Sequence, residues 1–129
     1  MRVLSSWVSA GVPALIATLL RMTRAATTPP DGWIGWALVR GDSMLPQLRP
    51  GDRLLVSYRR RPRPGDVVVA VFVDGTVAVK RAVERRGAGW WLLSDNLAAG
   101  TDSRHRGPVD ESAVWGTAVA RVWPRPRLL

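Results

Sequence analysis

The amino-acid sequence predicts a mainly β protein: a small antiparallel β-sheet or barrel-like domain preceded by a short N-terminal hydrophobic helix. Runs rich in valine, leucine and tryptophan recur along the chain, and clusters of glycine, proline or aspartate separate them. The dipeptide Asp74-Gly75 lies between two such runs, which is a strong signal for a two-residue β-hairpin loop. We therefore expect neighbouring strands to pair in antiparallel fashion.

The N-terminal segment, residues 1–24, differs in composition from the rest. Residues 3–20 carry no charge and are bounded by Arg2 on one side and by Arg21 and Arg24 on the other. As a helix, this stretch would be about 27 Å long, close to the thickness of a bilayer core. We predict a membrane anchor, with a cleaved signal sequence and an amphipathic interfacial helix as alternatives. Residues 25–32 contain two prolines and are predicted to be a linker to a domain at residues 33–129.

Six strands are predicted in this domain. They are residues 33–40, 53–58, 66–73, 76–86, 90–94 and 113–123. In the fourth, side-chain alternation places Lys80 on the face that also carries Ala78 and Ala82. Val77 and Val79 take the opposite face. We expect the two small alanines to leave space beside Lys80 for a peptide strand.

Composition limits the possible partners and chemistries. The 129 residues suffice for one core, and the net charge of +9 predicts attraction to anionic surfaces. The densest arginine run, residues 59–63, is interrupted by Pro62 and followed by Pro64, so we interpret it as a solvated loop and expect no nucleic-acid partner. The chain has no cysteine and one histidine, His105, which lies in a polar run and is predicted to be solvated. A cysteine nucleophile and a Cys/His or two-histidine metal site are thereby excluded within one chain.

Lys80 is the only lysine among 19 Lys and Arg residues. A guanidinium stays protonated in proteins, whereas an ammonium group in an apolar site can lose its proton and act as a general base. Lys80 is therefore a candidate catalytic base, and a chance surface lysine is the alternative. With cysteine absent, a serine or threonine paired with this lysine is the simplest nucleophilic chemistry available, and it requires no metal or organic cofactor.

The candidate nucleophile is Ser43, in a predicted sharp turn between Gly41 and Pro46. Glycine permits backbone angles closed to other residues, and proline stiffens the exit from the turn. A serine on such a turn can expose its hydroxyl and offer its own backbone N–H to a developing oxyanion. An ordinary loop serine is the alternative.

These residues belong to a series of short motifs that resembles type I signal peptidases, the membrane serine-lysine endopeptidases. The motifs, in order, are Gly41-Asp42-Ser43-Met44-Leu45-Pro46, Gly51-Asp52, Pro64-Gly65-Asp66, Val79-Lys80-Arg81, Ser94-Asp95-Asn96 and Asp102-Ser103-Arg104. The resemblance covers about residues 39–123. The short chain, its Trp90-Trp91 pair and its Arg-Val-Trp-Pro ending are also similar to a small actinobacterial branch that includes the nickel-type superoxide dismutase maturation proteases.

The resemblance implies a role for each matching residue. Ser43 would be the nucleophile and Lys80 the general base, and the Ser43 N–H would form part of the oxyanion hole. Gly41 and Met44 would lie where the substrate approaches. The residues expected to surround and support the site are Asp95, Asn96, Thr101, Asp102, Ser103 and Arg104.

Two positions depart from the family pattern. Ser94 stands where the family usually has glycine, a change at a backbone turn that we expect to be tolerated. Gly100 stands where the family commonly has a serine that hydrogen-bonds the catalytic lysine. We therefore expect Lys80 to be oriented by Thr101, by water, or less well than usual, with lower catalytic efficiency.

The serine-lysine pair and the resemblance together predict a serine endopeptidase domain, and the resemblance implies that it cleaves an N-terminal signal or pro-segment from precursor proteins. The expected partners are a precursor protein and a lipid membrane, and the expected location is the membrane, through a single N-terminal span. Arginines flank the hydrophobic stretch on both sides, so charge does not set its orientation. A cytoplasmic protein that matures another enzyme is the alternative location.

Two other functions remain open. A LexA-like self-cleaving regulator shares the Gly-x-Ser-Met turn and the Val-Lys-Arg strand, and the Ala10-Gly11 bond is a plausible self-cleavage site. Pro46 and the motif at residues 102–104 are evidence against it. A catalytically weak β module that binds peptides is the second alternative, which Gly100 favours.

Overall fold

The structure, a computed structural model, describes residues 31–129. The predicted anchor at residues 1–24 and all but the end of the predicted linker lie outside the described residues. The strands are β1 (Ile34–Leu38), β2 (Arg53–Ser57), β3 (Val67–Val71), β4 (Val77–Arg86), β5 (Gly89–Leu93), β6 (Val109–Asp110), β7 (Val114–Trp123) and β8 (Arg127–Leu128). Two short helices, α2 (Ser103–Arg106) and the 3₁₀ helix η1 (Glu111–Ala113), lie between β5 and β7.

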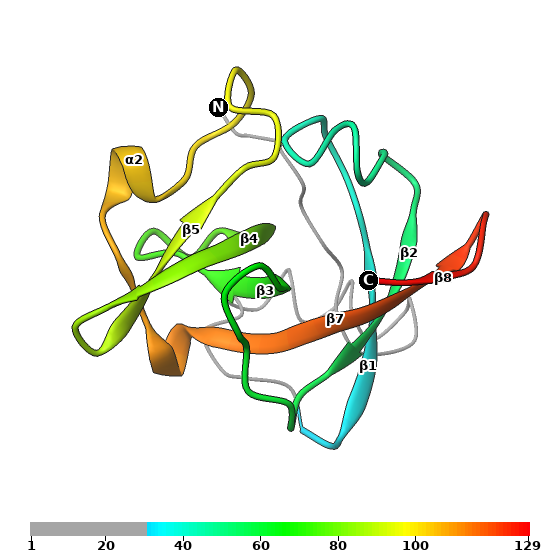
Figure 1. Cartoon of the computed structure of the whole chain (residues 1–129), viewed down its shortest axis with the longest axis horizontal. Coiled ribbons are helices and arrows are strands. Elements are labelled where there is room, and N and C mark those ends of the chain that lie inside the picture. The colour runs from blue at the N-terminus through cyan, green and yellow to red at the C-terminus, as the bar shows by residue number, and fades with distance from the viewer. Residues whose placement is uncertain (1–30) are drawn as a thin grey trace.

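The strands form one curled antiparallel sheet. They pair in the order β1-β2-β7-β3-β4-β5-β6, and β8 pairs with β7. In Figure 1, β1 and β2 lie on one side of the molecule, β4 and β5 lie on the other, and the long strand β7 crosses between them. The predicted mainly β, antiparallel fold is confirmed.

Each of the six predicted strands is present, with bounds that differ by one or two residues. The two-residue strands β6 and β8 and the helices α2 and η1 were not predicted. Such short segments have too few residues to show either a period of two or a period of 3.6.

The hairpin between β3 and β4 is confirmed, but its predicted two-residue loop is wrong. The N–H of Phe72 donates to the carbonyl of Thr76 over 2.8 Å, so residues 73–75 form a three-residue loop. Its last residue, Gly75, has a φ of +88°, and a glycine with positive φ is typical at that position of a three-residue hairpin loop.

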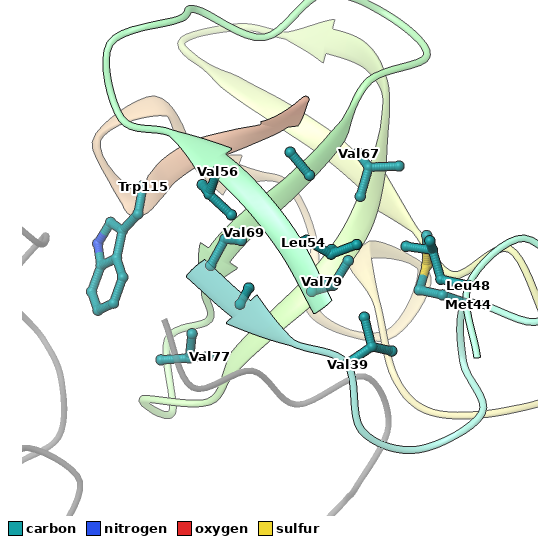
Figure 2. Close-up of a cluster of buried hydrophobic side chains, with 12 residues drawn as sticks. Val39, Met44, Leu48, Leu54, Val56, Val67, Val69, Val77, Val79 and Trp115 are labelled. Atoms are coloured by element: carbon teal, nitrogen blue, oxygen red, sulfur yellow. The ribbon is translucent and has the colours of Figure 1, made fainter. Parts of the chain in front are cut away.

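The central strands β3 and β4 are buried on both faces. One face contributes to a cluster that also contains Met44 and Leu48 at one end and Trp115 at the other (Figure 2). The opposite face contributes to a second cluster, which contains Val68, Ala70, Ala78, Ala82, Trp90 and Leu92. The alternation predicted for β4 is confirmed, because Val77 and Val79 belong to the first cluster. Lys80 is buried in the same strand, between these two apolar clusters.

Candidate active site

Ser43 lies in a turn that follows β1. Gly41 enters this turn with a φ of +75°, which glycine adopts without strain. The N–H of Leu48 donates to the carbonyl of Met44 over 2.9 Å and closes one helical turn. Both side chains are fully buried in the first cluster, where they lie close together in Figure 2, so the core holds the turn from inside. The side chain of Met44, predicted to lie on the substrate approach, is thus part of the core.

Lys80 and Ser43 are in hydrogen-bond contact, although 37 residues separate them in the chain. The ammonium nitrogen Nζ of Lys80 donates to Ser43 Oγ over 3.1 Å and to Ser94 Oγ over 2.9 Å. The exposed fractions of Ser43, Lys80 and Ser94 are 0%, 1% and 2%. The two residues predicted to form the catalytic pair are therefore adjacent and shielded from bulk water.

Burial changes the acidity of Lys80. Desolvation lowers the pKa of its ammonium group from 10.5 to about 8, because the charged form loses its hydration. The negative charge of Asp102 opposes this shift, while the positive charges of Arg106 and Arg104 add to it. A substantial fraction of Lys80 is thus neutral at mildly alkaline pH, and the neutral amine is the form that can accept a proton from a serine hydroxyl.

The hydrogen bond between Lys80 and Ser94 was not predicted from the sequence. Residues Arg81 and Leu93 are paired across β4 and β5, so the same register places Ser94 opposite Lys80 on the same face. A β-bulge between Ala82 and Glu84 shifts the pairing by one residue. Without that shift, the register of the hairpin end would place Asp95 opposite Lys80. The hairpin alone indicates the approximate position, but the bulge decides which residue faces the lysine.

The next two residues hold neighbouring parts of the site. Asp95 accepts two hydrogen bonds from Arg81, at 3.0 and 2.7 Å, which tie the loop to the strand that carries Lys80. Asn96 fixes the serine turn: its N–H donates to the Ser43 carbonyl over 2.8 Å, and its side-chain amide donates to the Asp42 carbonyl over 3.2 Å. Asp95 and Asn96 thus hold the strand and the turn that carry Lys80 and Ser43.

Asp102 is a buried anchor beneath the lysine. Its carboxylate accepts from the N–H of Ser94 over 2.9 Å and from Arg104 Nε over 2.9 Å. Burial alone would raise the pKa of Asp102, but the hydrogen bonds from Arg104 and Ser94 lower it below its usual value. Ser103 Oγ accepts from the N–H of Leu92 over 2.9 Å, so it braces β5 against α2.

Three residues close to Asp102 in the chain are exposed at the surface. Thr101 and Gly100 are exposed, and Gly100 has a φ of +71°. Of the three alternatives for Lys80, orientation by Thr101 finds no support in the hydrogen bonds of residues 31–129, because Thr101 is exposed while the buried lysine donates to Ser94. His105 is exposed, as predicted, and its ring accepts from the N–H of Asp102 at the start of α2.

The expected space beside Lys80 is filled. Ala78 and Ala82 are buried in the second cluster, which also contains Trp90, so they do not line an open path. Ser43 is fully buried as well.

The described part of the chain contains no group of three or more His, Cys, Asp or Glu side chains placed to hold a metal ion. No helix within residues 31–129 has the length and apolar character needed to span a bilayer.

Comparisons with known proteins point to proteases. A family model described as Peptidase S24-like matches residues 2–119. The chain is 43% identical over 75 residues to the mitochondrial ATP-independent inner membrane protease subunit 1a of Arabidopsis thaliana. The aligned region covers 57% of this chain and 36% of the relative. It is 31% identical over 116 residues to the mitochondrial inner membrane protease subunit 1 of Schizosaccharomyces pombe. This aligned region covers 69% of this chain and 73% of the relative. The chain thus spans about a third of the first relative's length. Similarity to the small actinobacterial branch stays a prediction.

Proposed function

Because the chain belongs to the Peptidase S24-like family, we propose that it is a serine endopeptidase in which Ser43 is the nucleophile and Lys80 is the general base. The observation that carries this proposal is the 3.1 Å contact between Lys80 Nζ and Ser43 Oγ, made by a buried lysine whose pKa is lowered to about 8. The proposed reaction is removal of an N-terminal signal or pro-segment from a precursor protein. The resemblance to type I signal peptidases supports this substrate class, and the relatives named as proteases support peptidase activity.

The proposed mechanism is acyl transfer. Neutral Lys80 accepts the Ser43 hydroxyl proton while Ser43 Oγ bonds to the scissile carbonyl carbon. The carbonyl oxygen becomes an oxyanion, which the Ser43 N–H stabilises. As the C–N bond breaks, the Lys80 ammonium returns the proton to the leaving amine. Neutral Lys80 then deprotonates a water molecule as the water oxygen bonds to the acyl carbon. The bond from that carbon to Ser43 Oγ breaks, and the Lys80 ammonium returns the proton to Ser43 Oγ.

Cleavage should depend on pH in a defined direction. Since only neutral Lys80 can accept the serine proton, we expect the rate to rise as pH increases through about 8 and to fall as the lysine is protonated below it. The test incubates the protein with a mixture of defined peptides from pH 6 to 9.5 and identifies new termini by mass spectrometry, with circular dichroism to follow folding. We expect cuts after small residues. Cleavage that continues in Ser43→Ala, or a rate that falls steadily from pH 6, would contradict the proposal.

We also propose that the protein acts at a membrane, held by a single span within residues 1–24. The net charge of +9 favours anionic lipid surfaces. The sheet adds exposed aromatic side chains: Trp36 pairs with Leu55 across β1 and β2, and Trp123 pairs with Arg53 across β2 and β7. Tryptophan and arginine together are typical of membrane–water interfaces. The relatives named as inner membrane proteases support the same location.

Cell fractionation tests this location. The full-length chain should sediment with membranes and remain there after a high-salt wash, which removes proteins held by charge alone. Deletion of residues 1–24 should release an active domain. Recovery of the intact chain in the soluble fraction after the wash would contradict the span and favour the cytoplasmic alternative.

The same assays separate the two rival functions. A self-cleaving regulator would yield fragments of its own chain, cut near Ala10-Gly11, in a reaction whose rate does not depend on protein concentration. A peptide-binding module would yield no new termini. The contact between Lys80 and Ser94 removes the reason for expecting a poorly oriented lysine, and so weakens the case for an inactive module.

A further inference from the structure

The buried ammonium group of Lys80 has two serine partners, and the proposed mechanism uses only one of them. Nζ lies 3.1 Å from Ser43 Oγ and 2.9 Å from Ser94 Oγ. A lysine side chain has four rotatable bonds, so one contact to the nucleophile does not fix the direction of its nitrogen lone pair. A second contact from another direction restricts the side chain to one arrangement.

We infer that Ser94 is a positioning residue that directs the Lys80 nitrogen toward Ser43. This role rests on the proposed function, because it has meaning only if Lys80 is the base. Ser94 acts through Lys80 and does not touch the reacting carbonyl. Proton transfer requires the base within hydrogen-bond reach of the serine hydroxyl, and a misplacement of about 1 Å can lower the rate about 100-fold.

The surroundings of Ser94 support this role. Its backbone N–H donates to the buried carboxylate of Asp102 over 2.9 Å, and Asp102 is in turn held by Arg104. Asp102 therefore holds the backbone of Ser94, which directly follows β5. The bulge between Ala82 and Glu84 sets the register that turns the Ser94 side chain toward the lysine. A short side chain with one hydroxyl fits this site, which is almost completely buried.

The single lysine makes a direct test possible. When only lysine carries an isotope label at its side chain, the NMR spectrum contains one lysine signal, so the titration of Lys80 can be read in each variant without assignment. The second measurement is kcat and KM for one cleaved peptide above pH 8.5, where the amine is mostly neutral in the wild type.

We expect Ser94→Ala to lower kcat by about 10- to 100-fold with KM nearly unchanged. We also expect the Lys80 midpoint to move below the wild-type value of about 8, because the ammonium form loses an acceptor. Ser94→Thr keeps a hydroxyl and should recover most of kcat. If Ser94→Ala does not fold, Ser94→Cys keeps the shape with a weaker acceptor, and it should show the same changes at smaller size.

Thr117→Val is the matched control. Thr117 is also fully buried, and its hydroxyl donates to the carbonyl of Arg60 over 2.9 Å. This variant should lose stability but keep kcat and the Lys80 midpoint. Wild-type kcat and midpoint in Ser94→Ala, or an equal shift of the midpoint in Thr117→Val, would overturn the role of Ser94. No cleavage by the wild type at any pH would instead contradict the proposed function.

Discussion

Lys80→Arg is expected to lose cleavage as completely as Ser43→Ala, by several orders of magnitude. Arginine keeps the positive charge and the length of lysine, but its guanidinium cannot give up a proton near neutral pH, so it cannot act as a base. Lys80→Met, which has a similar length and no charge, should be equally inactive. Cleavage rates for one peptide, measured on variants shown to be folded by circular dichroism, test this expectation.

The effects of Ser43→Ala and Lys80→Ala on the cleavage rate should not be additive. Ser43 and Lys80 act on the same proton, so once one is absent the other has nothing left to contribute. The double variant Ser43→Ala/Lys80→Ala should therefore be no slower than either single variant within about threefold. An active Lys80→Arg enzyme would end the proposed mechanism. A double variant slower by the product of the two single effects would show that the residues act independently.

Lys80→Met should make the fold more stable at neutral pH. Burial lowers the pKa of Lys80 from 10.5 to about 8, so below pH 8 the native state holds a poorly hydrated charge that the unfolded chain keeps in water. The corresponding cost to the free energy of unfolding is about 3 kcal/mol. Lys80→Met removes this desolvation cost. It also removes the hydrogen bonds from Lys80 to the two serine hydroxyls, so the net increase in the free energy of unfolding is smaller.

The pH dependence of the stability difference between Lys80→Met and the wild type shows whether the desolvated charge of Lys80 causes it. Between pH 8 and 10.5 the folded protein has released the Lys80 proton while the unfolded chain still binds it, so the stability of the wild type should rise with pH in this range. The advantage of Lys80→Met should therefore be greatest below pH 8 and disappear above about 10.5. Denaturant unfolding at pH 7 and pH 10 measures both values. A variant that is less stable than the wild type at pH 7, or a difference that does not change with pH, would contradict the assigned desolvation.

Sequence patterns were sufficient for the main strands and for selecting the two residues that we propose as the catalytic pair. Runs rich in valine, leucine and tryptophan, separated by turn residues, located all six long strands, because such residues are enriched in strands and glycine, proline and aspartate in the turns between them. Lys80 could be chosen because it is the only lysine, and Ser43 because its turn contains Gly41 and Pro46. The structure brings these two residues together as expected.

The contact to Ser94 could not be predicted in the same way. The sequence leaves the register between β4 and β5 open, since a bulge that shifts it by one residue has no distinct signature near Ala82. The sequence instead left three alternatives for Lys80, namely orientation by Thr101, orientation by water, or a poorer orientation than usual, because Gly100 occupies the position of the family's lysine-bonding serine. Loop geometry places Thr101 at the surface. Likewise, the burial of Ala78 and Ala82 depends on how the whole sheet curls, which single-strand patterns do not contain.

Covalent capture of the nucleophile tests the central claim most directly. An activated peptide ester that ends in alanine, mixed with the protein at pH 9 and quenched in acid, should leave its acyl group on the peptide fragment that contains Ser43. The mass of that fragment should increase by one acyl group in the wild type, with little or no increase in Lys80→Met and none in Ser43→Ala. An acyl group found on another residue, or acylation of Ser43 at the wild-type rate in Lys80→Met, would contradict the proposal that Lys80 activates Ser43.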